Sequence, residues 1–164
     1  MDNEHYQDHL LAYIDCLGFS ERISHSSQGS DFINVLTTLR SFSNFQTEFN
    51  IDTKKHEHGQ TTNFCPSISA FSDHIVISYP ISDMITGHNI SIEAILFALQ
   101  RVIARISIHA LSSDFLMRGG ITIGKLYHKQ GIIFGEALIE AYKLESQVAV
   151  YPRIIFSKKV LEPV

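Results

Sequence analysis

One stretch near the start of the chain limits most strongly what the chain can fold into. Residues 10–20 (LLAYIDCLGFS) begin as an apolar run of strand character, which a single carboxylate, Asp15, interrupts near its end. Gly18 and Ser20 then favour a turn and a helix N-cap, and Glu21 suits the first turn of a following helix. Backbone N–H groups at such a helix start point at an anion, and the carboxylate can hold a hard cation. The stretch fits a phosphate and metal cradle, and equally a strand-end Asp that caps a helix.

A second stretch, residues 67–79 (SISAFSDHIVISY), predicts a β-hairpin. Two strands, 68–71 and 75–79, flank a tight turn at 72–74 that contains Asp73. Asp73 would lie beside the end of the first strand of the pair. Carboxylates from two separate elements form a minimal site for divalent metal ions that bridge phosphate oxygens. Asp is also a favoured turn residue, so the position alone is open to a purely structural interpretation.

Composition places the chain among ordinary globular proteins. The 164 residues are 45% hydrophobic and 18% charged, which predicts a single domain over 1–164. The formal net charge of -4 argues against general nucleic-acid binding, which favours a basic face. Two cysteines are too few for a disulfide framework, and Cys16 reads as a small buried filler. The first residues are polar, and we expect no apolar run long enough to span a bilayer. Both features predict a cytoplasmic protein without membrane contact.

Helical periodicity predicts two long helices. The second helix is expected over residues 91–110, with Ser91 as its N-cap. The first should begin near Ser30 and present one apolar face. That face comprises Phe32, Val35, Leu36, Leu39, Phe42, Phe45 and Phe49.

The last third of the chain predicts strands and one further helix. A strand with close backbone approach is expected over residues 116–127, followed by a short extended piece at 131–134. Residues 135–147 should be helical, and 151–156 should form an edge strand. The inward residues of that helix are expected to be Leu138, Ala141, Tyr142 and Leu144. The order β-α-β-β-α-β-(β)-α-β predicts an α+β fold with helices packed on an antiparallel sheet.

Some side chains have two interpretations. His56 and His58 are metal ligands by residue type, but without an acid or Cys partner at ligand spacing they fit solvated loop histidines better. Arg118 could reach a phosphate or form a structural ion pair. Tyr142 could stack on a base, although an inward aromatic at helical spacing is more often part of a core.

Four blocks, taken together, carry a resemblance to the class III nucleotidyl cyclases. They are residues 13–20 (YIDCLGFS), 71–73 (FSD), 118–124 (RGGITIG) and 135–145 (GEALIEAYKLE). The blocks occur in the family's order and cover most of the chain. The resemblance implies a ferredoxin-like cyclase core that works as a head-to-tail homodimer with active sites at the interface. Family members usually continue with further C-terminal strands, which indicates a truncated or divergent member.

The same resemblance implies roles for individual residues. Asp15 and Asp73 match the two metal-binding aspartates, and the backbone carbonyl of Cys16 matches the third contact to two Mn²⁺ or Mg²⁺ ions per site. The substrate would be a nucleoside triphosphate, whose ribose 3′-hydroxyl attacks the α-phosphate and releases pyrophosphate. The loop that matches the triphosphate-binding segment consists of Leu17, Gly18, Phe19 and Ser20.

The departures from the family are informative. Ser69 and Ile132 stand where adenylate and guanylate cyclases carry a polar pair that reads the purine. Ile139 and Lys143 stand where the family has Asn and Arg to hold the ribose and to stabilise phosphate charge. Lys143 keeps the positive charge but lacks the bidentate fork of Arg.

This altered pattern, followed by residues 151–154 (YPRI), resembles the pyrimidine cyclases of bacterial Pycsar anti-phage systems. That resemblance implies conversion of UTP or CTP to cyclic UMP or CMP, which activates a separately encoded effector. Two alternatives stay open: a catalytically degenerate cyclase-like module that binds nucleotide or dimerises, and an adenylate or guanylate cyclase with an unusual base pocket.

Overall fold

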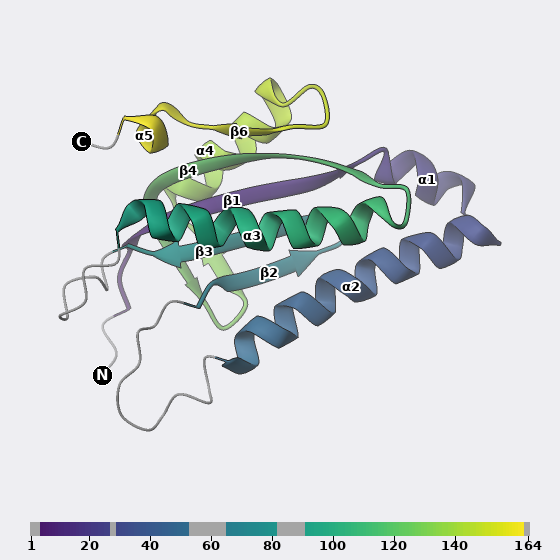
Figure 1. Cartoon of the computed structure of the whole chain (residues 1–164), viewed down its shortest axis with the longest axis horizontal. Helices are drawn as coiled ribbons and strands as arrows, with labels where there is room; N and C mark the ends of the chain where they lie inside the picture. Colours follow the sequence, from purple (N-terminus) through teal and green to yellow (C-terminus); the bar gives the residue numbers. More distant parts are fainter. Residues whose placement is uncertain (1–3, 27–28, 53–64, 82–90, 163–164) are drawn as a thin grey trace.

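The structure is a computed structural model that describes residues 4–26, 29–52, 65–81 and 91–162. Within these ranges the chain forms a mixed sheet with helices on it (Figure 1). In chain order the elements are β1 (Gln7–Leu17), α1 (Phe19–His25), α2 (Ser30–Asp52), β2 (Ser67–Phe71), β3 (His74–Pro80), α3 (Ile92–Leu111), β4 (Leu116–Lys129), β5 (Ile132–Phe134), α4 (Glu136–Lys143), a π-helical turn at Leu144–Val148, β6 (Ile154–Phe156) and α5 (Lys158–Leu161).

The sheet has β1 at its centre. The strand order is β2-β3-β1-β4-β5, and β6 pairs with β4. β1 runs antiparallel to both β3 and β4, whereas β6 runs parallel to β4. The predicted α+β class is therefore confirmed. The element order differs from the prediction in having two helices, α1 and α2, between β1 and β2, and in the added helix α5; β6 joins the sheet in parallel.

Alternation along β1 separates the two faces of the sheet. Leu10, Ala12 and Ile14 belong to the larger core with α2 and α3, whereas Leu11 packs in a smaller cluster with α4, against which Tyr13 lies. Since successive side chains of a strand point to opposite faces, Asp15 lies on the α4 face. α4 thus covers the face that carries the candidate carboxylate.

α4 approaches the sheet closely because β4 has no side chain at Gly120. A Cβ at this position would lie 2.5 Å from the backbone oxygen of Ala141 and 2.6 Å from Cβ of Leu144. Gly124, also beneath α4, has more room: the nearest atom to its Cβ would be that of Ala137 at 3.5 Å.

Three details differ from the sequence-based expectations. Gly18, not Ser20, is the N-cap of α1, because its φ of 75° ends the strand and starts the helix two residues earlier. Phe32 is 49% exposed, since the first turns of α2 extend past the end of the sheet (Figure 1). Tyr142 is 50% exposed, because Ala137 and Ala141 occupy the inner line of α4.

α3 bears out the predicted helix N-cap. Its N-cap is Ser91, as predicted, whose side chain accepts a hydrogen bond from Ala94 N. By length and composition alone α3 is apolar enough to cross a membrane, a test that the core helix of a globular domain also passes. In this fold it packs one face on the sheet as a core helix. His56 and His58 lie outside the described residues.

We predict that Gly120→Ala destabilises the fold by about 1–3 kcal/mol, the usual range for an overpacked core position. The added methyl must push α4 away from β4. Gly124→Ala is the matched control, because its methyl enters ordinary van der Waals contact. Urea unfolding of both variants measures the difference, and equal stabilities would contradict the packing argument.

Candidate active site

The candidate site is centred on Asp15, near the end of the central strand. Strand register places His74 of β3 and Arg118 of β4 directly opposite Asp15 on either side. Arg118 Nε donates a hydrogen bond of 3.1 Å to Asp15 Oδ2, and His74 Nε2 lies 3.5 Å from Asp15 Oδ1. Cross-strand neighbours on one face of a sheet meet in this way. Asp15 therefore has a cationic or titratable partner on both neighbouring strands.

The β2–β3 turn brings the second carboxylate to the same place. Ser72, at φ 52°, and Asp73 form a two-residue turn. The predicted turn included His74, but His74 is the first residue of β3. The Asp73 carbonyl accepts a hydrogen bond of 3.2 Å from Cys16 N, which ties the hairpin tip to the end of β1. Asp15, Asp73 and His74 each offer a donor atom within 4.8 Å of the others.

A third acid, Glu145, approaches from the π-helical turn after α4. Its side chain is only 2% exposed, and its Oε1 lies 2.5 Å from Arg118 Nε without the geometry of a hydrogen bond. Sequence reasoning did not single out Glu145. The signal that could have found it is spacing, since it follows the inward-facing Ala137 and Ala141 at intervals of four. π-Turns inside helices are frequent at functional sites.

Burial and like charges shape the electrostatics of this cluster. Burial raises the pKa of Asp15, against the lowering effects of His74 and Arg118, and Asp73 raises it further. Burial likewise raises the pKa of Glu145, which Arg118 opposes. The pKa of the Cys16 thiol is raised to about 12 by burial and by the two aspartates, so this thiol stays protonated and fills the core as expected.

The residues fit a divalent metal ion. When ionised, the carboxylates of Asp15, Asp73 and Glu145 carry three negative charges against one positive charge on Arg118. Carboxylates that burial and mutual repulsion disfavour as anions are stabilised by a cation. The donor set at the mouth of this cluster, two aspartates and an imidazole, suits such an ion.

The predicted phosphate loop adjoins these carboxylates. Leu17 ends β1, Gly18 adopts a left-handed conformation, and Phe19 and Ser20 begin α1. No side chain caps the start of α1. Phe19 is buried against Phe115, with ring centroids 5.7 Å apart, and this contact anchors the loop.

Ser69 belongs to a buried polar chain that sequence reasoning missed. His128 Nε2 lies 2.8 Å from Ser69 Oγ, and His128 Nδ1 lies 2.8 Å from Ser78 Oγ. Burial lowers the pKa of His128 to about 4, so the imidazole is neutral at pH 7. Ile132 lies on the other face of the β4–β5 hairpin, because His128 pairs with Ile133. The single chain therefore does not bring Ser69 and Ile132 together.

Ile132 instead lines a pocket of about 330 Å³. The other residues lining it are Glu4, His5, Tyr6, Tyr127 and Phe134.

Lys143 and Ile139 also lie apart from the carboxylates. Both are exposed, and each follows an inward-facing alanine by two positions, which places them on the outward side of α4. Arg118, by contrast, forms the ion pair that was one of its two expected roles, and 27% of its side chain remains exposed.

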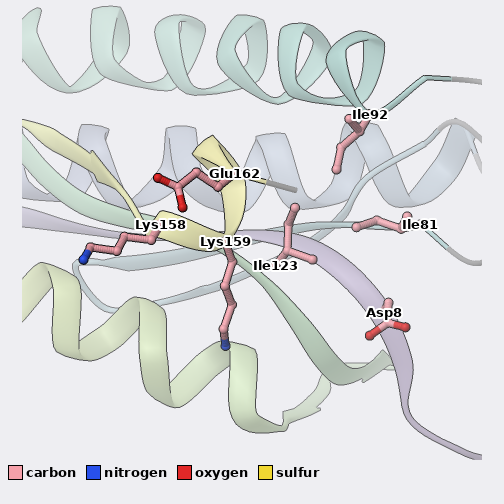
Figure 2. A pocket seen from close by; sticks show the side chains of 7 residues that line it. All are labelled: Asp8, Ile81, Ile92, Ile123, Lys158, Lys159 and Glu162. Atoms are coloured by element: carbon pink, nitrogen blue, oxygen red, sulfur yellow. The ribbon is translucent and has the colours of Figure 1, made fainter. Parts of the chain in front are cut away.

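Figure 2 shows a larger pocket, of about 550 Å³, near the opposite end of β1. Asp8 at its rim is seven positions before Asp15 along the strand, so the pocket is not part of the carboxylate cluster. Its lining residues are Asp8, Ile81, Ile92, Ile123, Lys158, Lys159 and Glu162.

The fold is similar to that of two solved cyclases. One is the adenylyl cyclase CyaB from P. aeruginosa, with a TM-score of 0.56 and 13% identity over 94% of this chain and 79% of that chain. The other is the guanylyl cyclase Cya2, with a TM-score of 0.56 and 13% identity over 95% of this chain and 77% of that chain. No family model and no curated protein match the sequence. The likeness confirms the predicted class III cyclase fold.

We predict that His128 makes stability depend on pH. Its folded pKa of about 4 lies below the ordinary 6.5, so the unfolded chain binds more protons between these values. Stability should therefore fall as the pH decreases from 6.5 to 4, by up to about 3 kcal/mol from this group.

Urea unfolding across this pH range measures the effect in wild type and in His128→Gln, whose amide can still donate and accept. The variant should show a flatter profile. His109→Gln, at an exposed histidine of α3, should keep the wild-type slope. A slope unchanged by His128→Gln would refute the assignment.

Proposed function

We propose that the chain is a pyrimidine nucleotide cyclase, which converts UTP or CTP to the 3′,5′-cyclic monophosphate and pyrophosphate. The observation that carries this proposal is the convergence of Asp15 and Asp73, from two separate elements, beside the Gly18 turn of a cyclase fold. The hydrogen bond from Cys16 N to the Asp73 carbonyl continues the pairing of β1 with β3 and holds the hairpin tip beside the end of β1.

In the proposed reaction the ribose 3′-oxygen forms a bond to the α-phosphorus. The bond from that phosphorus to the oxygen shared with the β-phosphate breaks, pyrophosphate leaves, and the hydroxyl proton passes to solvent. Two Mn²⁺ or Mg²⁺ ions, held by Asp15, Asp73 and the Cys16 carbonyl, would neutralise phosphate charge and activate the hydroxyl. Little protein acid–base chemistry is needed, since phosphoryl transfer depends mainly on positioning and charge.

The chain's own groups then bind and orient the triphosphate. The amides of Leu17, Gly18, Phe19 and Ser20 would hold the phosphates, as anions favour uncapped N–H groups. Arg118 keeps Asp15 in place through its hydrogen bond, and its exposed part can contact a phosphate. This assignment gives Asp15, Asp73, Arg118 and the loop at residues 17–20 a positioning or charge-stabilising task.

Base recognition is proposed to be pyrimidine-specific because the purine-reading pair is absent. Ser69 offers a hydroxyl that His128 holds in place, and Ile132 offers only an aliphatic side chain. Ser69 Oγ can exchange a hydrogen bond with the polar edge of a small base. If ATP or GTP were the substrate instead, neither of these two positions would offer a charged or amide group to read the purine.

We propose further that the active sites are shared between two copies of the chain arranged head to tail. Phe71 at the end of β2 is 82% exposed, and Ile139 on α4 is 57% exposed. Lys143 points outward, so it would reach phosphate charge in the site of a partner chain. The cyclic nucleotide would then activate a separately encoded effector in bacterial antiviral defence, which assigns the protein to the cytoplasm.

The decisive assay incubates the protein with each of the four ribonucleoside triphosphates and Mn²⁺, with products identified by mass. We expect cyclic UMP or cyclic CMP. Asp73→Asn should lower the rate by at least about 100-fold, as expected for a group that stabilises developing charge. Asp8→Asn, which removes a surface carboxylate paired with Lys125, is the control and should leave the rate unchanged.

Other outcomes of this assay distinguish the alternatives. Cyclisation of ATP or GTP but neither pyrimidine would make the protein an adenylate or guanylate cyclase with an unusual pocket. Nucleotide binding without pyrophosphate release, in wild type and Asp73→Asn alike, would favour the degenerate cyclase-like module. The replacement of the family's Asn and Arg by Ile139 and Lys143 is the feature that supports this second candidate.

A mixing experiment tests the shared site. Asp15→Asn and Lys143→Ala, each strongly impaired alone, should together restore about a quarter of the wild-type activity when co-expressed, because random pairing leaves one intact site in each mixed dimer. Co-expression that restores no activity would argue that Lys143 and Asp15 act in the same site of one chain. Full activity of Lys143→Ala alone would show that Lys143 has no role.

A further inference from the structure

His74 is the part of the carboxylate cluster that the proposed function does not use. It begins β3, pairs in register with Asp15, and directly follows Asp73. Its Nδ1 lies 3.2 Å from Asp73 Oδ1 and its Nε2 lies 3.5 Å from Asp15 Oδ1. The ring of Tyr13 packs against the imidazole, with centroids 5.4 Å apart, and limits its rotation. The imidazole is thus held between both carboxylates.

This geometry matches that of a metal-binding histidine. Two donor atoms that share one ion at about 2.1–2.2 Å lie roughly 3–3.5 Å apart, as Nε2 and Asp15 Oδ1 do here. A ligating histidine usually gives its other ring N–H to a carboxylate, and Nδ1 is within reach of Asp73. About a third of the His74 side chain remains exposed, which leaves the donor atoms accessible to an ion from solvent.

A separate observation concerns the charge balance of the cluster. The buried Oε1 of Glu145 has no hydrogen-bond partner among the described residues, although Glu145 shares Arg118 with Asp15. One guanidinium therefore serves two carboxylates, and Asp73 adds a third. A divalent ion beside Asp15 would restore the charge balance and relieve the demand on Arg118.

We propose that His74 is a third protein ligand of this site, and that its nitrogen makes the site select Mn²⁺ or a similar transition-metal ion over Mg²⁺. Mg²⁺ prefers oxygen ligands in a near-ideal octahedron, whereas an imidazole suits first-row transition metals. The inference deepens the proposed function, because it concerns the same metal site. Its test measures metal binding and does not require turnover.

The alternative is that His74 is an ion-pair partner only. A protonated imidazole between Asp15 and Asp73 would occupy the place of the ion and compete with it. The two assignments predict opposite effects of removing the ring: loss of Mn²⁺ affinity if His74 is a ligand, and unchanged or increased affinity for both metals if it is a competitor.

The experiment measures binding of Mn²⁺ and Mg²⁺, without nucleotide, to the whole chain by calorimetry and by competition followed with Mn²⁺ electron paramagnetic resonance. Wild type should bind Mn²⁺ at least about 10-fold more tightly than Mg²⁺. His74→Gln should lose about 10-fold or more in Mn²⁺ affinity with little change for Mg²⁺. His74→Asp, which supplies an oxygen instead, should shift the preference toward Mg²⁺.

Two controls keep the outcome decisive. His5→Gln, beyond the other end of β1, should keep wild-type affinity. Pulsed resonance of bound Mn²⁺ should show coupling to a nitrogen nucleus in wild type and none in His74→Gln. Unchanged metal preference in His74→Gln, or no nitrogen coupling in wild type, would overturn the role of His74.

The two proposals can fail separately. Binding of Mn²⁺ that is equally absent from wild type and Asp15→Asn would overturn this inference and the metal-dependent cyclase together. His74-dependent Mn²⁺ binding without any cyclic product would support this inference and contradict only the proposed function.

Discussion

The arrangement at the end of the sheet depends on Arg118, which forms ion pairs with two carboxylates. Arg118 lies between the carboxylates of Asp15 and Glu145, and so joins the central strand, its neighbour β4 and the turn after α4. A buried charge pair contributes little net stability, but removing one partner leaves an uncompensated charge and is costly. These contacts therefore specify an arrangement more than they stabilise the fold: Arg118 orients the Asp15 carboxylate through its hydrogen bond.

Glu145 reaches Arg118 because α4 can lie close to β4. The absence of a side chain at Gly120 allows the backbone of Ala141 and the side chain of Leu144 to approach the strand. The π-helical turn then widens the helix by a residue at the point where Glu145 must face inward. A packing feature in the middle of the sheet thus determines the electrostatics at its end.

Sequence patterns predicted the elements whose signals are local. Three predicted elements were found: the strand that carries Asp15 near its end, the hairpin around Asp73 and the helix capped by Ser91. Each has turn or capping residues within a few positions. The predicted helix start at Ser20 was wrong because Gly18, two residues earlier, adopts a left-handed conformation and caps the helix. The prediction that Tyr142 faces inward was wrong because the buried side of α4 is narrow. Ala137 and Ala141 make the contact with the sheet, and Tyr142 lies beside them, half exposed.

The partners of the site residues could not be predicted in the same way. Asp15 has neighbours that come from distant parts of the chain. Strand register places His74 and Arg118 beside it, and the packing of α4 brings Glu145 to Arg118. His128 reaches Ser69 and Ser78 for the same reason. A single sequence contains no local signal for such contacts, so the carboxylates were identified and their surroundings were not.

The chain of hydroxyls around His128 has a consequence for what Ser69 can offer. A neutral imidazole has one N–H and one bare nitrogen, so one of its two serines must accept and the other must donate. If Nε2 carries the proton, Ser69 accepts from it and its own O–H is free to donate. If Nδ1 carries the proton, the Ser69 hydroxyl donates its hydrogen bond to Nε2 and can only accept from other groups. The ring nitrogen of His128 that carries the proton thus determines whether the Ser69 hydroxyl of β2 is free to donate a hydrogen bond. No heavy atom has to move for this change.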